Sequence, residues 1–159
     1  MALSGVIQFV RGVLNGADEV QHVDRRQEAI RVATAAVLLE VAHADSDVSS
    51  DEEVVILAHL NRAFGLEGDA ARTLVEAARD IRDKTIDHWH LTNLIRTNTS
   101  IDERTEIVRS MWRIIFSDGF FHQYEGYLVR KLSELLGLEH HVMIEIKLEV
   151  KRDMGSGAE

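Results

Sequence analysis

The sequence contains no cysteine, which excludes disulfide bonds, thiolate metal ligands and a cysteine nucleophile. It also contains no proline, so nothing along its 159 residues forces a helix to stop. No hydrophobic run approaches the roughly 20 residues that a membrane-spanning helix needs, so no transmembrane segment is expected. These absences favour a soluble protein built from long helices.

Positive charge is scarce: 18 Lys and Arg residues stand against 27 Asp and Glu residues, and the formal net charge is -9 at pH 7. Nucleic acids and anionic lipids repel such a chain unless it carries a strong basic patch. The short basic stretches at Arg25 and Lys147 are diluted by neighbouring acids. We therefore expect no nucleic-acid partner, and expect cations or proteins as partners instead.

The length fits a single domain with a sizeable core. We expect a short N-terminal helix or arm over 1–23, a helical domain over 24–152 and a disordered tail over 153–159. The arm lacks the charged start and cleavage site of a signal peptide, which indicates a cytoplasmic protein. Its mild amphipathicity also allows weak membrane association.

Hydrophobic residues recur with helical spacing, and no segment alternates as a half-buried strand does. Ser49 and Ser100 each stand three residues before a glutamate, as in a capping box, and Gly65 and Gly137 suit helix C-termini. Further N-caps are expected at Asp24, Asp69 and Asp87. The sequence thus predicts a compact all-α bundle of about seven helices, over about 25–44, 49–65, 69–83, 87–97, 101–117, 122–136 and 139–152.

Two segments of the chain match each other. In both, an apolar helix ends at an aspartate (Asp45, Asp118), a short loop follows, and a glutamate lies in the first turn of the next helix. The spacing between the two loops and the spacing between the closing glycines differ by one residue, so the equivalent of Glu125 is either Glu52 or Glu53. This internally duplicated helix–loop–helix unit would bring both loops together about a pseudo-two-fold axis. The same alignment pairs Glu40 with Arg113, a hypothetical ion pair between the repeats.

Acidic groups gather at the two loops. An aspartate just past a helix C-terminus is disfavoured by about 0.3–1 kcal/mol unless a following helix or a cation compensates it. If the repeats meet, an oxygen-rich cluster that suits Ca²⁺, Mg²⁺ or Mn²⁺ would contain Asp45, Asp118, Glu52 or Glu53, Glu125 and the one histidine placed to join it, His122. Helix capping explains the same residues without a metal, and both interpretations stay open.

Aromatic residues suggest where the core and a partner surface lie. Trp89 is expected in the core, with the flanking histidines at the surface. A cluster near the second loop is explained mainly by core packing and alternatively by an exposed patch for a protein partner; it comprises Phe120, Phe121, Tyr124 and Tyr127. No serine elbow, phosphate loop or nucleophile–base pair is found, so we expect no enzyme. Glu-x-x-His pairs at Glu19 and Glu40 leave a carboxylate-bridged metalloenzyme as a weaker alternative.

Taken together, the two loop motifs resemble the tellurite resistance protein TerB-like family and the related N-terminal domain of membrane-anchored DnaJ-like proteins. The motifs are His43-Ala-Asp45-Ser-Asp47-Val-Ser-Ser-Asp-Glu52 and Phe116-Ser-Asp118-Gly-Phe-Phe-His122-Gln-Tyr124-Glu125. The resemblance covers about 25–140. It departs from the family pattern at Asp45-Ser46, where the family usually has Asp-Gly.

The resemblance implies a compact fold of about seven helices and a divalent-metal site made by acidic residues of both repeats. Carried over by position, it nominates as ligands Asp45, Asp47, Glu52, Asp118, His122 and Glu125. It also implies a stress-response or interaction module. The prediction is therefore a non-enzymatic metal-binding module, with a metal-free interaction adaptor as the alternative.

Overall fold

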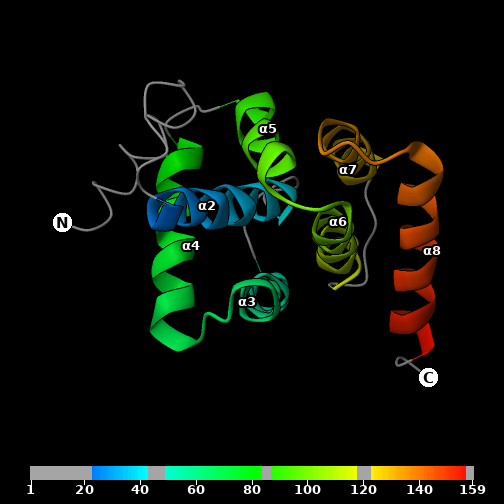
Figure 1. The fold of residues 1–159 in the computed structure, drawn as a ribbon. Helices are drawn as coiled ribbons and strands as arrows, with labels where there is room; N and C mark the ends of the chain where they lie inside the picture. The colour runs from blue at the N-terminus through cyan, green and yellow to red at the C-terminus, as the bar shows by residue number, and fades with distance from the viewer. Residues whose placement is uncertain (1–22, 43–48, 84–86, 118–122, 157–159) are drawn as a thin grey trace.

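The computed structural model describes residues 23–42, 49–83, 87–117 and 123–156. Within these ranges the chain forms seven α-helices and no strand (Figure 1). The helices are α2 (Val23–Ala42), α3 (Ser50–Phe64), α4 (Gly68–Asp83), α5 (His88–Asn98), α6 (Ile101–Phe116), α7 (Gln123–Leu135) and α8 (His140–Ser156). The predicted all-α class and the order of the helices are confirmed.

Helix α2 is the centre of the bundle. It packs against α3, α4, α5, α6 and α7, while α8 lies on the far side of α6 and α7 and covers them (Figure 1). Side chains from Ala29 to Leu39 are buried at every position except Arg31, so α2 is enclosed nearly all round. Its one buried hydroxyl, on Thr34, donates to the Ile30 carbonyl at 2.8 Å. Small alanines along α2 leave room for neighbouring helices to approach closely.

Local capping chemistry sets three of the helix starts as predicted. The Ser49 backbone N–H donates to Glu52 at 2.9 Å, and the Glu52 N–H donates to the Ser49 hydroxyl at 3.2 Å. The Ser100–Glu103 box has the same geometry, at 3.0 and 3.1 Å. Asp87 caps α5 by accepting from the His90 N–H at 3.0 Å. Both capping boxes and one of the three predicted aspartate caps are therefore confirmed.

Other boundaries differ from the prediction. Helix α2 begins at Val23 and α4 at Gly68, so Asp24 and Asp69 lie inside the first helical turn instead of preceding it. Helix α8 continues to Ser156, because Met154 still packs against the core. Residues 153–156, which were expected to belong to a disordered tail over 153–159, are thus part of α8. Residues 1–22 and 157–159 lie outside the described residues.

The prediction that Trp89 lies in the core is wrong. Its side chain is 56% exposed and makes an edge-to-face contact with the His90 ring. Helix α5 buries Leu91, Leu94 and Ile95 instead. Residues two positions apart do not share a helix face, so a helix that turns Leu91 inward turns Trp89 outward.

Gly137 closes the α7–α8 turn with a left-handed backbone, φ 82°. A Cβ atom there would lie 2.9 Å from Nη1 of Arg104 and 3.0 Å from Nε of Arg96. Arg104 is held in place because the same Nη1 donates to the Leu136 carbonyl at 2.8 Å. Gly137→Ala therefore combines backbone strain of about 1–2 kcal/mol with a steric contact.

Gly65 provides the matched control, since it has φ 69° but nothing lies within 4 Å of the place that an alanine methyl group would take. Urea unfolding should show that Gly137→Ala lowers the free energy of unfolding by more than Gly65→Ala does. Equal losses at the two glycines would mean that the arginine contacts contribute nothing.

Candidate functional site

Four of the six nominated metal ligands lie outside the described residues. Asp45 and Asp47 fall in 43–48, and Asp118 and His122 in 118–122, which lie outside the described residues. Glu125 lies in the first turn of α7, where the structure describes the backbone but not the side chain. Among side chains that are described, no three His, Asp or Glu residues gather as a metal site would require. Metal binding therefore stays a prediction.

Glu52 is the one nominated ligand whose side chain is described. It is only 4% exposed, in the first turn of α3, and one carboxylate oxygen is engaged by the Ser49 N–H. Its counterpart in the second capping box, Glu103, is exposed. A buried carboxylate needs compensation for its lost hydration, and the α3 N-terminus supplies part of it. Glu52 thus faces inward, in the first turn of the helix that follows the first acidic loop.

The structure separates Glu52 from Glu53. Glu53 is half exposed, and its carboxylate lies 4.0 Å from Arg79 on α4. Glu52 and Glu125 are each the third residue of their helices, α3 and α7. Glu52 and Glu125 thus hold the same position in their helices, whereas the duplication, and with it the equivalence of the two glutamates, stays a prediction.

The hypothetical ion pair between Glu40 and Arg113 stays a prediction. The Glu40 carboxylate on α2 lies 3.4 Å from Nε2 of His88 at the start of α5. Of the aromatic cluster near the second loop, only Tyr127 has a described side chain, and it is 64% exposed on α7. An aromatic surface for a partner thus has one described member.

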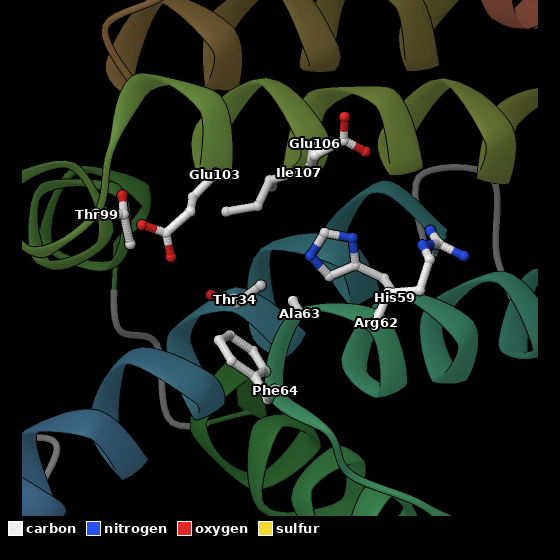
Figure 2. Close-up of a pocket in the computed structure, with 9 residues that line it drawn as sticks. All are labelled: Thr34, His59, Arg62, Ala63, Phe64, Thr99, Glu103, Glu106 and Ile107. Carbon is white, nitrogen blue, oxygen red and sulfur yellow. The ribbon is translucent and has the colours of Figure 1, made fainter.

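A pocket of about 330 Å³ opens between α2, α3 and α6, on the described part of the molecule (Figure 2). Its floor is buried and comprises Thr34 from α2, His59 from α3 and Ile107 from α6. Its rim is more exposed and consists of Arg62, Ala63, Phe64, Thr99, Glu103 and Glu106. The volume falls within the range of small-molecule sites.

His59 is the ionisable group at the floor of this pocket. It is 3% exposed, and its Nδ1 lies 2.7 Å from the hydroxyl of Ser110, which is fully buried on α6. Burial lowers the pKa of His59 from 6.5 to about 4, and the guanidinium groups of Arg62 and Arg113 act in the same direction. The imidazole is therefore neutral at physiological pH.

Charges at the rim are largely engaged. Glu103 accepts from the Ser100 N–H in its capping box, and Glu106 accepts from Nε of Arg109 at 3.2 Å. Arg109 also reaches Glu149 on α8. The side chain of Arg62 is exposed at the mouth of the pocket, beside these acids. The pocket consequently has a neutral floor and a rim of mixed charge.

Sequence reasoning missed both His59 and Ser110. The signal was present, because His59 follows Ile56 and precedes Leu60 on the buried stripe of α3. Ser110 lies between Ile107 and Ile114 on the stripe of α6. A polar residue at an apolar position of two helices that pack together indicates a buried hydrogen-bonded pair.

The helices packed around α2, with an inward-facing acid and a pocket with a polar floor, define an all-α helical domain. The family model of tellurite resistance protein TerB matches residues 31–148, which is most of the chain. The protein therefore belongs to the TerB family, as the two loop motifs indicated. No curated protein and no solved structure matches the chain. Every helix in the described ranges is too short or too polar to cross a bilayer.

Proposed function

We propose that this TerB-family chain is a non-enzymatic module that holds a divalent cation between its two acidic loops. The ion would be Ca²⁺, Mg²⁺ or Mn²⁺, because the ligands on offer are mainly carboxylate oxygens. Asp45, Glu52, Asp118 and Glu125 would supply the main ligands. Asp47 and His122 lie in the same two loops and would complete the shell.

The burial of the Glu52 carboxylate is the main observation that supports the proposal. A carboxylate that serves only as a capping-box partner can remain in solvent, as Glu103 does in the same geometry. Glu52 is instead turned inward at the end of the loop that contains Asp45. If the loop acids join Glu52 as proposed, a bound cation would offset the mutual repulsion of their carboxylates.

The arrangement of the helices also supports it. The acidic loops connect α2 to α3 and α6 to α7, and α6 packs against both α2 and α3. A cation that joins the two loops would tie one helix pair to the other. We infer that its role is to fix the relative pose of the two pairs and thereby the surface offered to a protein partner in the cytoplasm.

Calorimetric titration with Ca²⁺, Mg²⁺, Mn²⁺ and Zn²⁺ tests the proposal. We expect one ion per chain, and at a hundredfold excess over Kd a stabilisation of about 2.7 kcal/mol, visible as a higher Tm. The Asp45→Asn/Asp118→Asn double variant should bind at least about tenfold more weakly. No heat of binding and no Tm change with any ion would contradict a metal site.

A matched pair of variants separates metal binding from helix capping. Glu52→Gln and Glu103→Gln weaken equivalent capping boxes and should each lower stability by up to about 1 kcal/mol in metal-free protein. Only Glu52→Gln should also lower the affinity for the metal ion. Equal metal affinity in both variants would favour the metal-free adaptor, for which the exposure of Tyr127 is the supporting observation.

A further inference from the structure

The proton on the buried His59 imidazole can be assigned from its partner. Within the described residues, the Ser110 hydroxyl has one hydrogen-bond partner, Nδ1 of His59 at 2.7 Å. If Nδ1 carried the proton, the hydroxyl hydrogen would be buried without an acceptor, which costs roughly 1–3 kcal/mol. The favoured arrangement therefore has the Ser110 O–H donating to Nδ1, and the imidazole proton on Nε2.

The Nε2–H group faces the pocket. Among the described residues, Nε2 has no hydrogen-bond partner. It is also not one of the fully buried polar atoms that lack a partner, so it is accessible from the pocket. Figure 2 shows the free edge of the His59 ring turned toward the space below Ile107. The floor of the pocket thus presents a donor to whatever occupies it.

The opposite side of the pocket presents acceptors. Figure 2 shows the Glu103 carboxylate beside Thr99, across the pocket from the His59 ring, and only one of its oxygens is used in the capping box. The hydroxyls of Thr34 and Thr99 donate to the carbonyls of Ile30 and Ile95, at 2.8 and 2.6 Å. Their lone pairs therefore remain for a donor group of a ligand.

Apolar atoms form the remaining walls, from Phe64, Ala63 and Ile107. A carboxylate ligand would meet Glu103 and Glu106, and an ammonium ligand would leave the His59 Nε2–H without an acceptor. An uncharged group that has an acceptor and a donor side by side satisfies both sides of the pocket. A primary amide has this pattern.

We propose that this pocket binds a small uncharged organic molecule with an apolar, ring-sized body and an amide-like polar group. Its carbonyl oxygen accepts from Nε2–H of His59, its N–H donates to Glu103, and its body packs between Phe64 and Ile107. None of the residues that line this pocket is a nominated metal ligand, and the proposed occupant is an organic molecule and not a cation.

Four probes that share one ring test the assignment: benzamide, benzoate, benzylamine and toluene. NMR titration of isotope-labelled full-length protein should give saturable shifts at Phe64 and Ile107 with benzamide, and weaker binding with the other three. The ¹⁵N signal of His59 Nε2 should keep the shift of a protonated nitrogen. Benzamide affinity should fall at least about fivefold in His59→Phe, the loss expected for one hydrogen bond.

Glu103→Gln provides a second test at an exposed position that does not threaten the fold. It removes the repulsion of anions, so the preference for benzamide over benzoate should shrink. Toluene binding as tightly as benzamide would reduce the site to an apolar crevice, and a preference for benzoate would make it an anion site at Arg62. Either result, or the absence of saturable shifts, would overturn the proposal.

Discussion

Replacing Trp112 by alanine is expected to lower the free energy of unfolding by about 3–5 kcal/mol, the usual effect of removing a large aromatic side chain from a core. Trp112 is 2% exposed on α6, and its ring stacks on Phe116 with centroids 5.8 Å apart. The Lys147 ammonium of α8 lies 5.3 Å from the ring centroid and adds a cation–π contact. Trp112 therefore ties α8 to the rest of the bundle.

Trp89→Ala is the matched control for this experiment. The exposed Trp89 ring contacts His90 within its own helix, so its removal should change stability by no more than about 0.5–1 kcal/mol. Chemical denaturation of both variants, with Trp112→Phe as a milder step, measures the difference. Similar losses of stability in the two variants would mean that the Trp112 side chain is not buried in the core.

Helix positions were predictable because their determinants are local. A serine three residues before a glutamate satisfies the first free N–H groups of a helix, and a glycine accepts the left-handed turn that ends one. Ser49, Ser100, Gly65 and Gly137 all act in this way. Helix α4 begins at Gly68, one residue before the position predicted from Asp69.

The direction of individual side chains was less predictable because it depends on which helices meet. Trp89 points outward and Trp112 inward, and the neighbouring acids Glu52 and Glu53 also differ in burial. The His59–Ser110 pair joins residues 51 positions apart, and only the packing of α3 on α6 brings them together. The acidic residues were found from a repeated motif, whereas a pocket lined from several helices has no such motif.

The buried imidazole also makes stability depend on pH. In the folded protein the pKa of His59 is lowered to about 4, whereas in the unfolded chain it returns to 6.5. Between these two pH values the unfolded state binds a proton that the folded state does not bind. The free energy of unfolding therefore falls as the pH drops from about 6.5 toward 4. The full loss is roughly 3 kcal/mol, of which about 2 kcal/mol falls between pH 7 and pH 5.

His59→Gln isolates this contribution, because glutamine keeps an amide that can bond to Ser110 but does not titrate. Urea unfolding at pH 7 and pH 5 should show wild-type stability falling by about 2 kcal/mol more than that of the variant. Parallel pH profiles would mean that His59 is solvated or already charged in the folded state.

Protonation of His59 opposes folding in two ways. The cation loses its hydration in a site 3% exposed, near two guanidinium groups. A protonated Nδ1 also becomes a donor, so the Ser110 hydroxyl loses its only described acceptor and must turn its hydrogen elsewhere. An amide that accepts from the neutral Nε2–H stabilises the folded state that already exists at pH 7, so bound benzamide should shift the acid unfolding midpoint to lower pH. The same shift in His59→Gln would show that the benzamide effect does not pass through this imidazole.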